Sequence, residues 1–82
     1  MDHLEERLKR IFVTIFPHLS PNKIETADVE TVETWDSVAA ITLINLLEEE
    51  FGIEIDLDRA SELRSFSEIL GYLKERGVRE AS

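Results

Sequence analysis

The pattern of apolar and polar positions predicts an amphipathic helix at the start of the chain. Asp2 and Glu5 have the spacing of a capping box, and apolar residues then recur at intervals of three and four. The helix is expected to run to about Phe16, because Pro17 follows. Its apolar positions are Leu4, Leu8, Ile11, Phe12 and Ile15.

Residues 17–36 show no sustained periodicity and are predicted to form a long loop. Ser20 and Pro21 can open a single helical turn, with serine as the cap and proline at the first position. Loops of this length in compact domains are usually functional or ordered by their own side chains. Four residues are expected to pin the loop to the bundle: Ile24, Val29, Val32 and Trp35.

A second helix is predicted from about Ser37 to Glu50 or Phe51, where Gly52 is placed to end it in a left-handed conformation. Its apolar residues cover more than one narrow stripe, which predicts packing against several neighbours. They are Val38, Ile41, Leu43, Ile44, Leu46, Leu47 and Phe51.

Two shorter elements complete the pattern. Residues 53–56 form a brief extended link, after which Asp56 can cap a short third helix through about Leu63. Ser65 and Glu68 have capping-box spacing and open a last helix that continues to Gly77. The apolar face of this helix consists of Phe66, Ile69, Leu70 and Leu73.

These elements predict an all-α fold: a four-helix bundle with three long helices and a short third one, built as a single domain over residues 1–82. Gly71 lies inside the last helix and is expected to mark a close helix contact, and residues 78–82 are expected to fray. The chain has no cysteine, no signal segment and no apolar run of membrane-spanning length. We therefore expect a monomer in the cytoplasm.

The net charge of −9 is unevenly distributed. Residues 24–58 contain eleven acidic residues and no lysine or arginine, whereas the rest of the chain has seven acidic and nine basic residues. Such a block repels nucleic acid and anionic membranes and attracts proteins with basic docking patches. The alternative is that the acidity only aids solubility.

Metal-dependent and hydrolytic chemistry are poorly supported. His3 and His18 belong to no ligand motif, and Asp56 and Asp58 lack the further oxygen ligand and glycine of a calcium loop. A Ser-His-acid triad would need a cleft and an oxyanion hole that nothing in the pattern indicates. We expect no catalytic residues and no metal site.

Ser37 is the strongest candidate for a chemically modified residue. It lies where the acidic loop meets a helix start, so its hydroxyl is expected to be exposed beside backbone N–H groups that lack helical acceptors. A phosphate ester there would be stabilised by those donors and by the helix dipole. The simpler alternative is that Asp36 or Ser37 is only a helix cap.

Two runs carry a family resemblance: Trp-Asp-Ser-Val-Ala-Ala-Ile at residues 35–41, and Leu-Leu-Glu-Glu-Glu-Phe-Gly-Ile at residues 46–53. They resemble the acyl carrier and peptidyl carrier superfamily over nearly the whole chain. The resemblance implies that Ser37 receives covalent 4′-phosphopantetheine from coenzyme A through a magnesium-dependent transferase, which Asp36 helps to engage. The thiol of this arm then holds acyl groups as thioesters for partner enzymes, and the bundle can shelter an aliphatic chain.

The resemblance also implies a docking face on the second helix. Val38, Thr42, Asn45 and Glu49 share one face at spacings of three and four, and Glu48 flanks them. Basic patches on acyl-loading and acyl-processing enzymes would meet this strip. Charged contacts of this kind affect association rate and partner choice more than affinity.

Several positions depart from the fatty-acid carriers that the chain resembles. Val38 replaces the usual leucine, Trp35 follows Thr34 where Gly-Ala is common, and Ala39 and Thr42 stand where acids are frequent. These differences favour polyketide or other specialised biosynthesis over general fatty-acid synthesis, although Trp35 can equally be a loop anchor. The alternative function is an unmodified acidic helical adaptor that binds basic proteins.

Overall fold

The computed structural model describes residues 3–77, in which four α-helices and one 3₁₀ turn account for the regular structure. No strand occurs in this part of the chain apart from an isolated antiparallel bridge between Asp28 and Ser65. The predicted all-α fold with a short third helix is therefore confirmed. The elements are α1 (His3–Ile15), η1 (Pro21–Lys23), α2 (Ser37–Phe51), α3 (Leu57–Ala60) and α4 (Phe66–Glu75).

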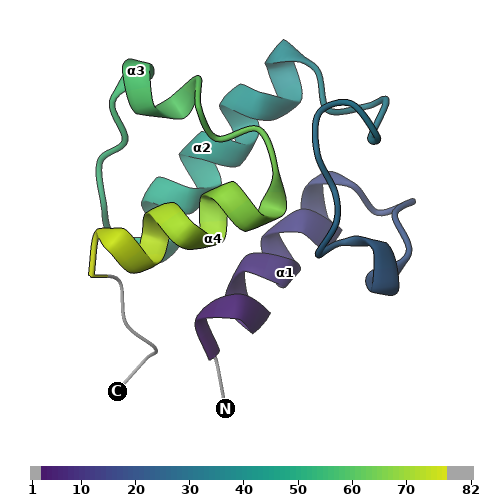
Figure 1. The fold of residues 1–82 in the computed structure, drawn as a ribbon, viewed down its shortest axis with the longest axis horizontal. Coiled ribbons are helices and arrows are strands. Elements are labelled where there is room, and N and C mark those ends of the chain that lie inside the picture. Colours follow the sequence, from purple (N-terminus) through teal and green to yellow (C-terminus); the bar gives the residue numbers. More distant parts are fainter. Residues whose placement is uncertain (1–2, 78–82) are drawn as a thin grey trace.

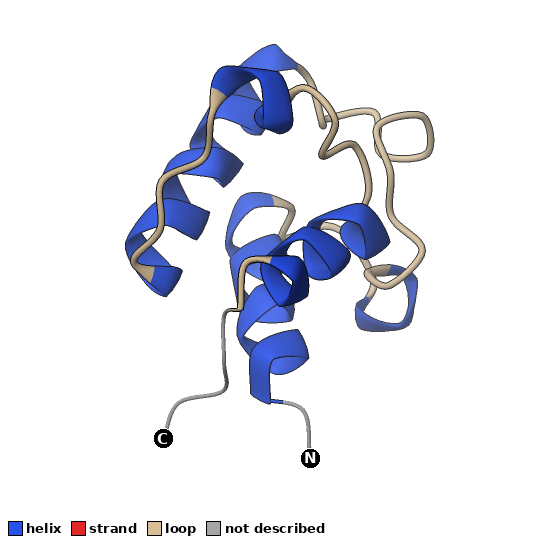
Figure 2. Cartoon of the chain, turned by 60° about the vertical axis from the view of Figure 1, so that its left-hand side comes forward, coloured by secondary structure: helices blue, strands red, loops and turns tan. Residues whose placement is uncertain are grey.

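The three longer helices enclose one core, and the long loop covers one side of it. In Figure 1, α4 lies in front of α2 and beside α1, and the loop joining α1 to α2 occupies the right-hand side of the view. Figure 2 shows α3 at one end of α2, connected to α2 and α4 by short loops. This arrangement brings the start of α2 close to the loop and to α3.

Aromatic side chains form the centre of the core. The ring of Phe12 lies 5.2 Å from that of Phe66 and 5.5 Å from that of Trp35, both edge-on, and 5.9 Å from that of Phe16. Edge-to-face pairs at these distances are favourable beyond their buried area. The other buried residues are Leu4, Leu8, Ile11, Ile24, Ala27, Val32, Leu43, Leu47, Ile55, Leu63, Ile69, Tyr72 and Leu73.

The helix ends agree closely with the local signals. Gly52 has φ +63° and its N–H donates to the carbonyl of Glu48, so the left-handed end predicted for α2 is confirmed. At α4 the Ser65 hydroxyl accepts the Glu68 N–H at 3.1 Å, while the Glu68 carboxylate accepts the N–H of Arg64 at 3.1 Å. The capping box is therefore present with its second bond moved one residue upstream. The cap predicted at Asp2 lies outside the described residues.

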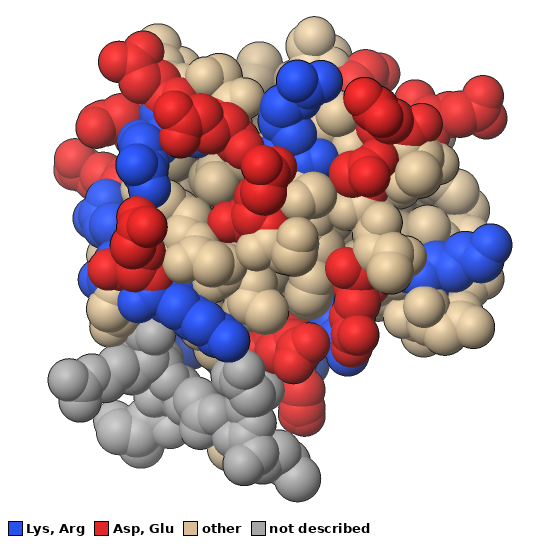
Figure 3. Space-filling view, viewed as in Figure 1, with Lys and Arg blue, Asp and Glu red and all other residues tan. Residues whose placement is uncertain are grey.

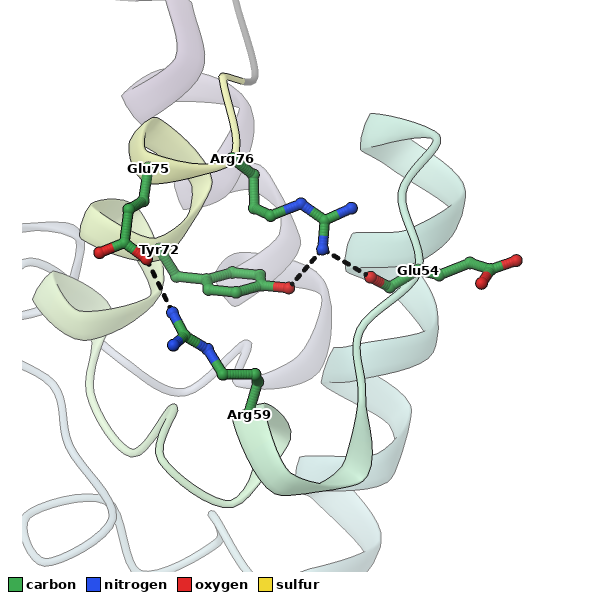
Figure 4. Close-up of polar contacts among 5 residues, drawn as sticks. All are labelled: Glu54, Arg59, Tyr72, Glu75 and Arg76. Carbon is green, nitrogen blue, oxygen red and sulfur yellow. Dashed lines mark hydrogen bonds and ion pairs between the residues drawn. The ribbon is translucent and has the colours of Figure 1, made fainter.

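A cluster of polar and aromatic side chains fastens α3 and the link that precedes it to α4 (Figure 4). The Tyr72 ring lies between the guanidinium groups of Arg59 and Arg76, which are 5.0 and 5.8 Å from its centroid. Arg76 Nη1 donates to the Tyr72 hydroxyl at 3.0 Å and to the carbonyl of Glu54 at 3.1 Å, and Arg59 pairs with Glu75 at 2.8 Å. These contacts restrain a segment that has little helix of its own.

Four predictions about these elements were wrong. The third helix ends at Ala60 and not near Leu63, because the chain turns there to bury Leu63, and the Asp56 side chain makes no capping bond. Ser20 likewise precedes η1 without a side-chain cap. Gly71 marks no close contact, since it is exposed and a Cβ built on it meets nothing within 4 Å.

The apolar surface of α2 is also less buried than its composition predicts. Leu43 and Leu47 are buried, but Val38 is 72% exposed and Ile41 is 63% exposed. The helix therefore packs on one side and leaves part of its apolar surface to solvent. Within residues 3–77, no helix combines the length and apolar character needed to cross a membrane.

Candidate functional site

Asp36, and not Ser37, caps α2. Asp36 has an extended backbone, and its Oδ1 accepts the Ala39 N–H at 2.9 Å, while its carbonyl accepts the Ala40 N–H at 2.9 Å. Ser37 is consequently the first residue of the helix, exposed, and its hydroxyl makes no hydrogen bond within the described structure. The exposure expected from the sequence is confirmed, and the hydroxyl is available for chemistry.

The start of α2 is held in place by Trp35. Its side chain is 5% exposed and packs 5.5 Å from the rings of both Phe12 and Phe16, and its N–H donates to the carbonyl of Val32 at 2.9 Å. Trp35 is thus a loop anchor, as predicted from the sequence. Its indole Nε1 is buried without a hydrogen-bond partner in the described residues.

The rest of the loop is tied to the segment that follows α3. Val29 N–H donates to the carbonyl of Arg64 at 3.0 Å, and Phe66 N–H donates to the carbonyl of Ala27 at 2.9 Å. The predicted pinning is confirmed: Ile24, Val32 and Trp35 are buried and Val29 is partly buried. These bonds fix the position of residues 60–65 relative to Ser37.

Asp28 orders the turn beside this bridge. Its Oδ1 accepts the N–H groups of Thr31 and Glu30, both at 2.8 Å. The pKa of the Asp28 carboxyl is lowered, chiefly by the hydrogen bond from the Thr31 backbone, with smaller contributions from the Glu30 backbone and the charge of Arg64. The loop is therefore shaped by its own polar side chains as well as by its apolar anchors.

A groove of about 530 Å³ opens between α2 and α3 with Ser37 at its rim. Its walls are mainly apolar, and two of its apolar residues reach far into solvent: Ile41 is 63% exposed and Leu57 is 89% exposed. Its volume lies in the range typical of small-molecule sites. We call it the apolar groove; besides Ser37 its lining comprises Ala40, Ile41, Ile44, Asn45, Glu48, Ile55, Leu57, Ala60 and Ser61.

All but one of the residues predicted to dock partner proteins are exposed along α2. Val38, Thr42, Asn45 and Glu49 are all exposed, and the Thr42 hydroxyl donates to the Val38 carbonyl at 3.0 Å. Glu48 is different because it is partly buried and its Oε2 accepts the N–H of Ile55 at 2.9 Å. Its carboxylate thus fastens the link after α2 to the helix.

Sequence reasoning missed three residues around the site. Ile41 and Leu57 form the exposed apolar margin of the groove, and Arg64 lies near Ser37 beside the loop. The excess apolar content of α2 was a signal for Ile41, since those residues were too many for one packing face. Nothing in the local pattern distinguished Arg64 from other surface arginines.

The surface charge is mixed where basic segments meet the acidic block. Figure 3 shows acidic side chains over much of the upper part of one face, with basic side chains between them along the left edge. Two ion pairs link α1 to the acidic block: Arg7 pairs with Glu50 at 2.8 Å and Lys9 with Glu25 at 2.6 Å. In residues 3–77 no group of three or more His, Cys, Asp or Glu side chains is arranged to hold a metal ion.

Comparisons with known proteins agree with this geometry. A family model described as a phosphopantetheine attachment site matches residues 35–73, a span that contains the whole lining of the apolar groove. An acyl carrier protein of Chlamydia trachomatis serovar D is 35% identical over 75 residues, covering 89% of this chain and 95% of that protein. The acyl carrier protein of Chlamydia trachomatis serovar A matches with the same identity and coverage.

Proposed function

We propose, since the chain belongs to the acyl carrier protein family, that Ser37 is the residue to which its 4′-phosphopantetheine is attached. Proteins of this family are carriers and not catalysts, and phosphopantetheine is their covalent cofactor. The observation that carries the proposal is the free, exposed hydroxyl of Ser37 at the first position of α2. Asp36 supplies the helix cap, so modification of Ser37 does not disturb it.

The surroundings of Ser37 fit such a group. The first N–H groups of α2 have no acceptor within the helix, and the helix dipole favours a phosphodiester at this end. When bound, the group supplies a terminal thiol that holds an acyl group as a thioester. The apolar groove supports shelter of the acyl chain, because each buried methylene contributes about 0.8 kcal/mol.

We assign partner docking to the exposed strip of Val38, Thr42, Asn45 and Glu49. The partners are a phosphopantetheinyl transferase and acyl-processing enzymes with basic patches, which the acidic block attracts. Asp36 is proposed to engage the transferase and its metal ion in addition to capping the helix. Glu48 contributes to docking only through its Oε1 atom, because its Oε2 accepts the Ile55 N–H.

We further propose that the carrier serves a specialised pathway. Trp35 no longer supports this idea because its burial explains it as a loop anchor, but Thr42 leaves the exposed strip less charged near its start. Mass spectrometry of acyl species on protein isolated from its host tests the proposal. Finding only the saturated chains of general fatty-acid synthesis would contradict it.

The attachment site is tested by incubating the protein with coenzyme A and a broad-specificity transferase and measuring its intact mass. Wild type should gain one phosphopantetheine and Ser37→Ala none. Ser61→Ala is the matched control, since Ser61 is also exposed and lines the same groove. Absence of the addition on wild type, or equal addition to Ser37→Ala, would overturn the proposal in favour of an unmodified adaptor.

A further inference from the structure

Two grooves diverge from Ser37. The second lies between the α1–α2 loop and the segment after α3, with a volume of about 360 Å³, and it shares Ser37, Ala40, Ala60 and Ser61 with the apolar groove. Its own residues are Val29, Trp35, Asp36, Leu63 and Arg64. We call it the Arg64 groove; unlike the apolar groove, it contains side chains of both charges.

Arg64 is held firmly at the edge of this groove. Its carbonyl accepts the N–H of Val29 at 3.0 Å, and its own N–H donates to the Glu68 carboxylate at 3.1 Å. The first bond belongs to the bridge to the loop and the second to the cap of α4. The backbone of Arg64 is therefore restrained from both sides, which fixes the point from which its side chain begins.

The charges around Ser37 make this arginine distinctive. Among the described residues lining the two grooves, Arg64 is the one basic side chain, whereas Asp36 and Glu48 are acidic. Arg59 is nearby in sequence, but it pairs with Glu75 and lies over the Tyr72 ring. A phosphodiester on Ser37 would lie next to the Asp36 carboxylate, and Arg64 is the basic side chain in these two linings that can balance its charge.

We infer that Arg64 is a positioning residue that pairs with the phosphodiester on Ser37 and directs the polar first part of the arm into the Arg64 groove. The inference rests on the proposed attachment at Ser37. The tether itself selects the occupant, because a group bonded to Ser37 is present at high effective concentration in a groove that begins there. The apolar groove is then left for the hydrocarbon of the acyl group.

The test uses isotope-labelled protein whose conversion to the phosphopantetheine form has been verified by mass. Attachment should shift the amide resonances of Val29, Leu63 and Arg64, and the phosphorus resonance should differ from that of unfolded modified protein. In Arg64→Gln both effects should be lost, and Arg64→Lys should restore part of them because it keeps the charge. Arg10→Gln is the matched control, an exposed arginine on α1 away from both grooves.

The outcomes separate the two proposals. If wild-type protein gains no phosphopantetheine, attachment fails and the inference fails with it. If the modified protein forms but its phosphorus resonance is the same in wild type and Arg64→Gln, only the inference is overturned. Amide shifts confined to Ile41, Ile44 and Leu57 would also overturn it, since they would place the arm in the apolar groove.

Discussion

Asp36 has one observed role and one proposed role, and a pair of substitutions can separate them. Its carboxylate caps α2 by accepting the Ala39 N–H at 2.9 Å, and it is proposed to engage the transferase. Asp36→Ala removes both roles, whereas Asp36→Asn keeps an acceptor oxygen in the same place and removes the charge. Because Asp36 is exposed, neither change disturbs the core.

The expected loss for Asp36→Ala is the value of a side-chain cap, about 1 kcal/mol within a range of roughly 0.5 to 2 kcal/mol. With an unfolding entropy of about 2.1 cal/mol/K per residue, that loss lowers the Tm of a domain of this size by about 6 °C. Asparagine caps about as well as aspartate. Asp36→Asn should therefore lose only the interaction of the charge with the helix dipole, about 0.3 to 1 kcal/mol.

The rate of modification should follow a different order. Loss of a charge-assisted contact to the transferase or its metal, about 1.5 to 3 kcal/mol, would slow attachment about tenfold or more in both variants. Urea unfolding followed by circular dichroism gives the stabilities, and a time course of intact mass at limiting transferase gives the rates.

Specific results would refute this reasoning. An Asp36→Ala variant as stable as wild type would show that the cap contributes nothing. An Asp36→Asn variant as unstable as Asp36→Ala would assign the stabilisation to charge and not to the hydrogen bond. Modification of Asp36→Asn at the wild-type rate would remove the carboxylate from recognition by the transferase.

Three other predictions concern the polar contacts that shape the site. Glu48→Ala should lower the unfolding free energy by about 1 to 3 kcal/mol, because it leaves the Ile55 N–H without its acceptor. Glu48→Gln keeps an acceptor oxygen, so its unfolding free energy in urea titrations should fall less. Equal losses of stability in the two variants would contradict this role. Tyr72→Phe removes the acceptor of the 3.0 Å bond from Arg76 and should lower stability by about 0.5 to 1.5 kcal/mol; hydrogen exchange should accelerate in residues 53–60, and unchanged exchange there would contradict a fastening role. The pKa of Asp28 is lowered in the folded state, so its contribution is present above the ordinary carboxyl pKa and is lost as pH falls through the lowered value. The stability difference between wild type and Asp28→Asn should accordingly shrink in acid, and a carboxyl that titrates at its ordinary pKa by NMR would contradict this.

Much of the helical layout could be predicted from sequence because helix ends depend on neighbouring residues. Gly52 ends α2 through its own φ of +63°, and Ser65 opens α4 with a bond to a residue three positions away. The same local reasoning placed Ser37 at a helix start. It could not choose between Asp36 and Ser37 as the cap, because both side chains can accept a backbone N–H there.

Predictions from local sequence were wrong where contacts between distant segments determine where a helix ends or which side chains are buried. The third helix stops at Ala60 because Leu63 is drawn into the core, and α2 leaves Ile41 exposed although its pattern predicted burial. Trp35 could be a partner contact or an anchor from sequence alone, and its packing on Phe12 and Phe16 decided for the anchor.

The sequence by itself determined the helix order, the acidic block and the position of Ser37 at the start of α2, because caps, turns and periodicity act over a few residues. The tertiary structure alone decided what surrounds that serine. Arg64 lies 27 residues after Ser37 in the chain, and the bridge between Asp28 and Ser65 holds its segment against the loop. Both grooves arise between segments distant in sequence, so their lining depends on how the helices and loops pack together.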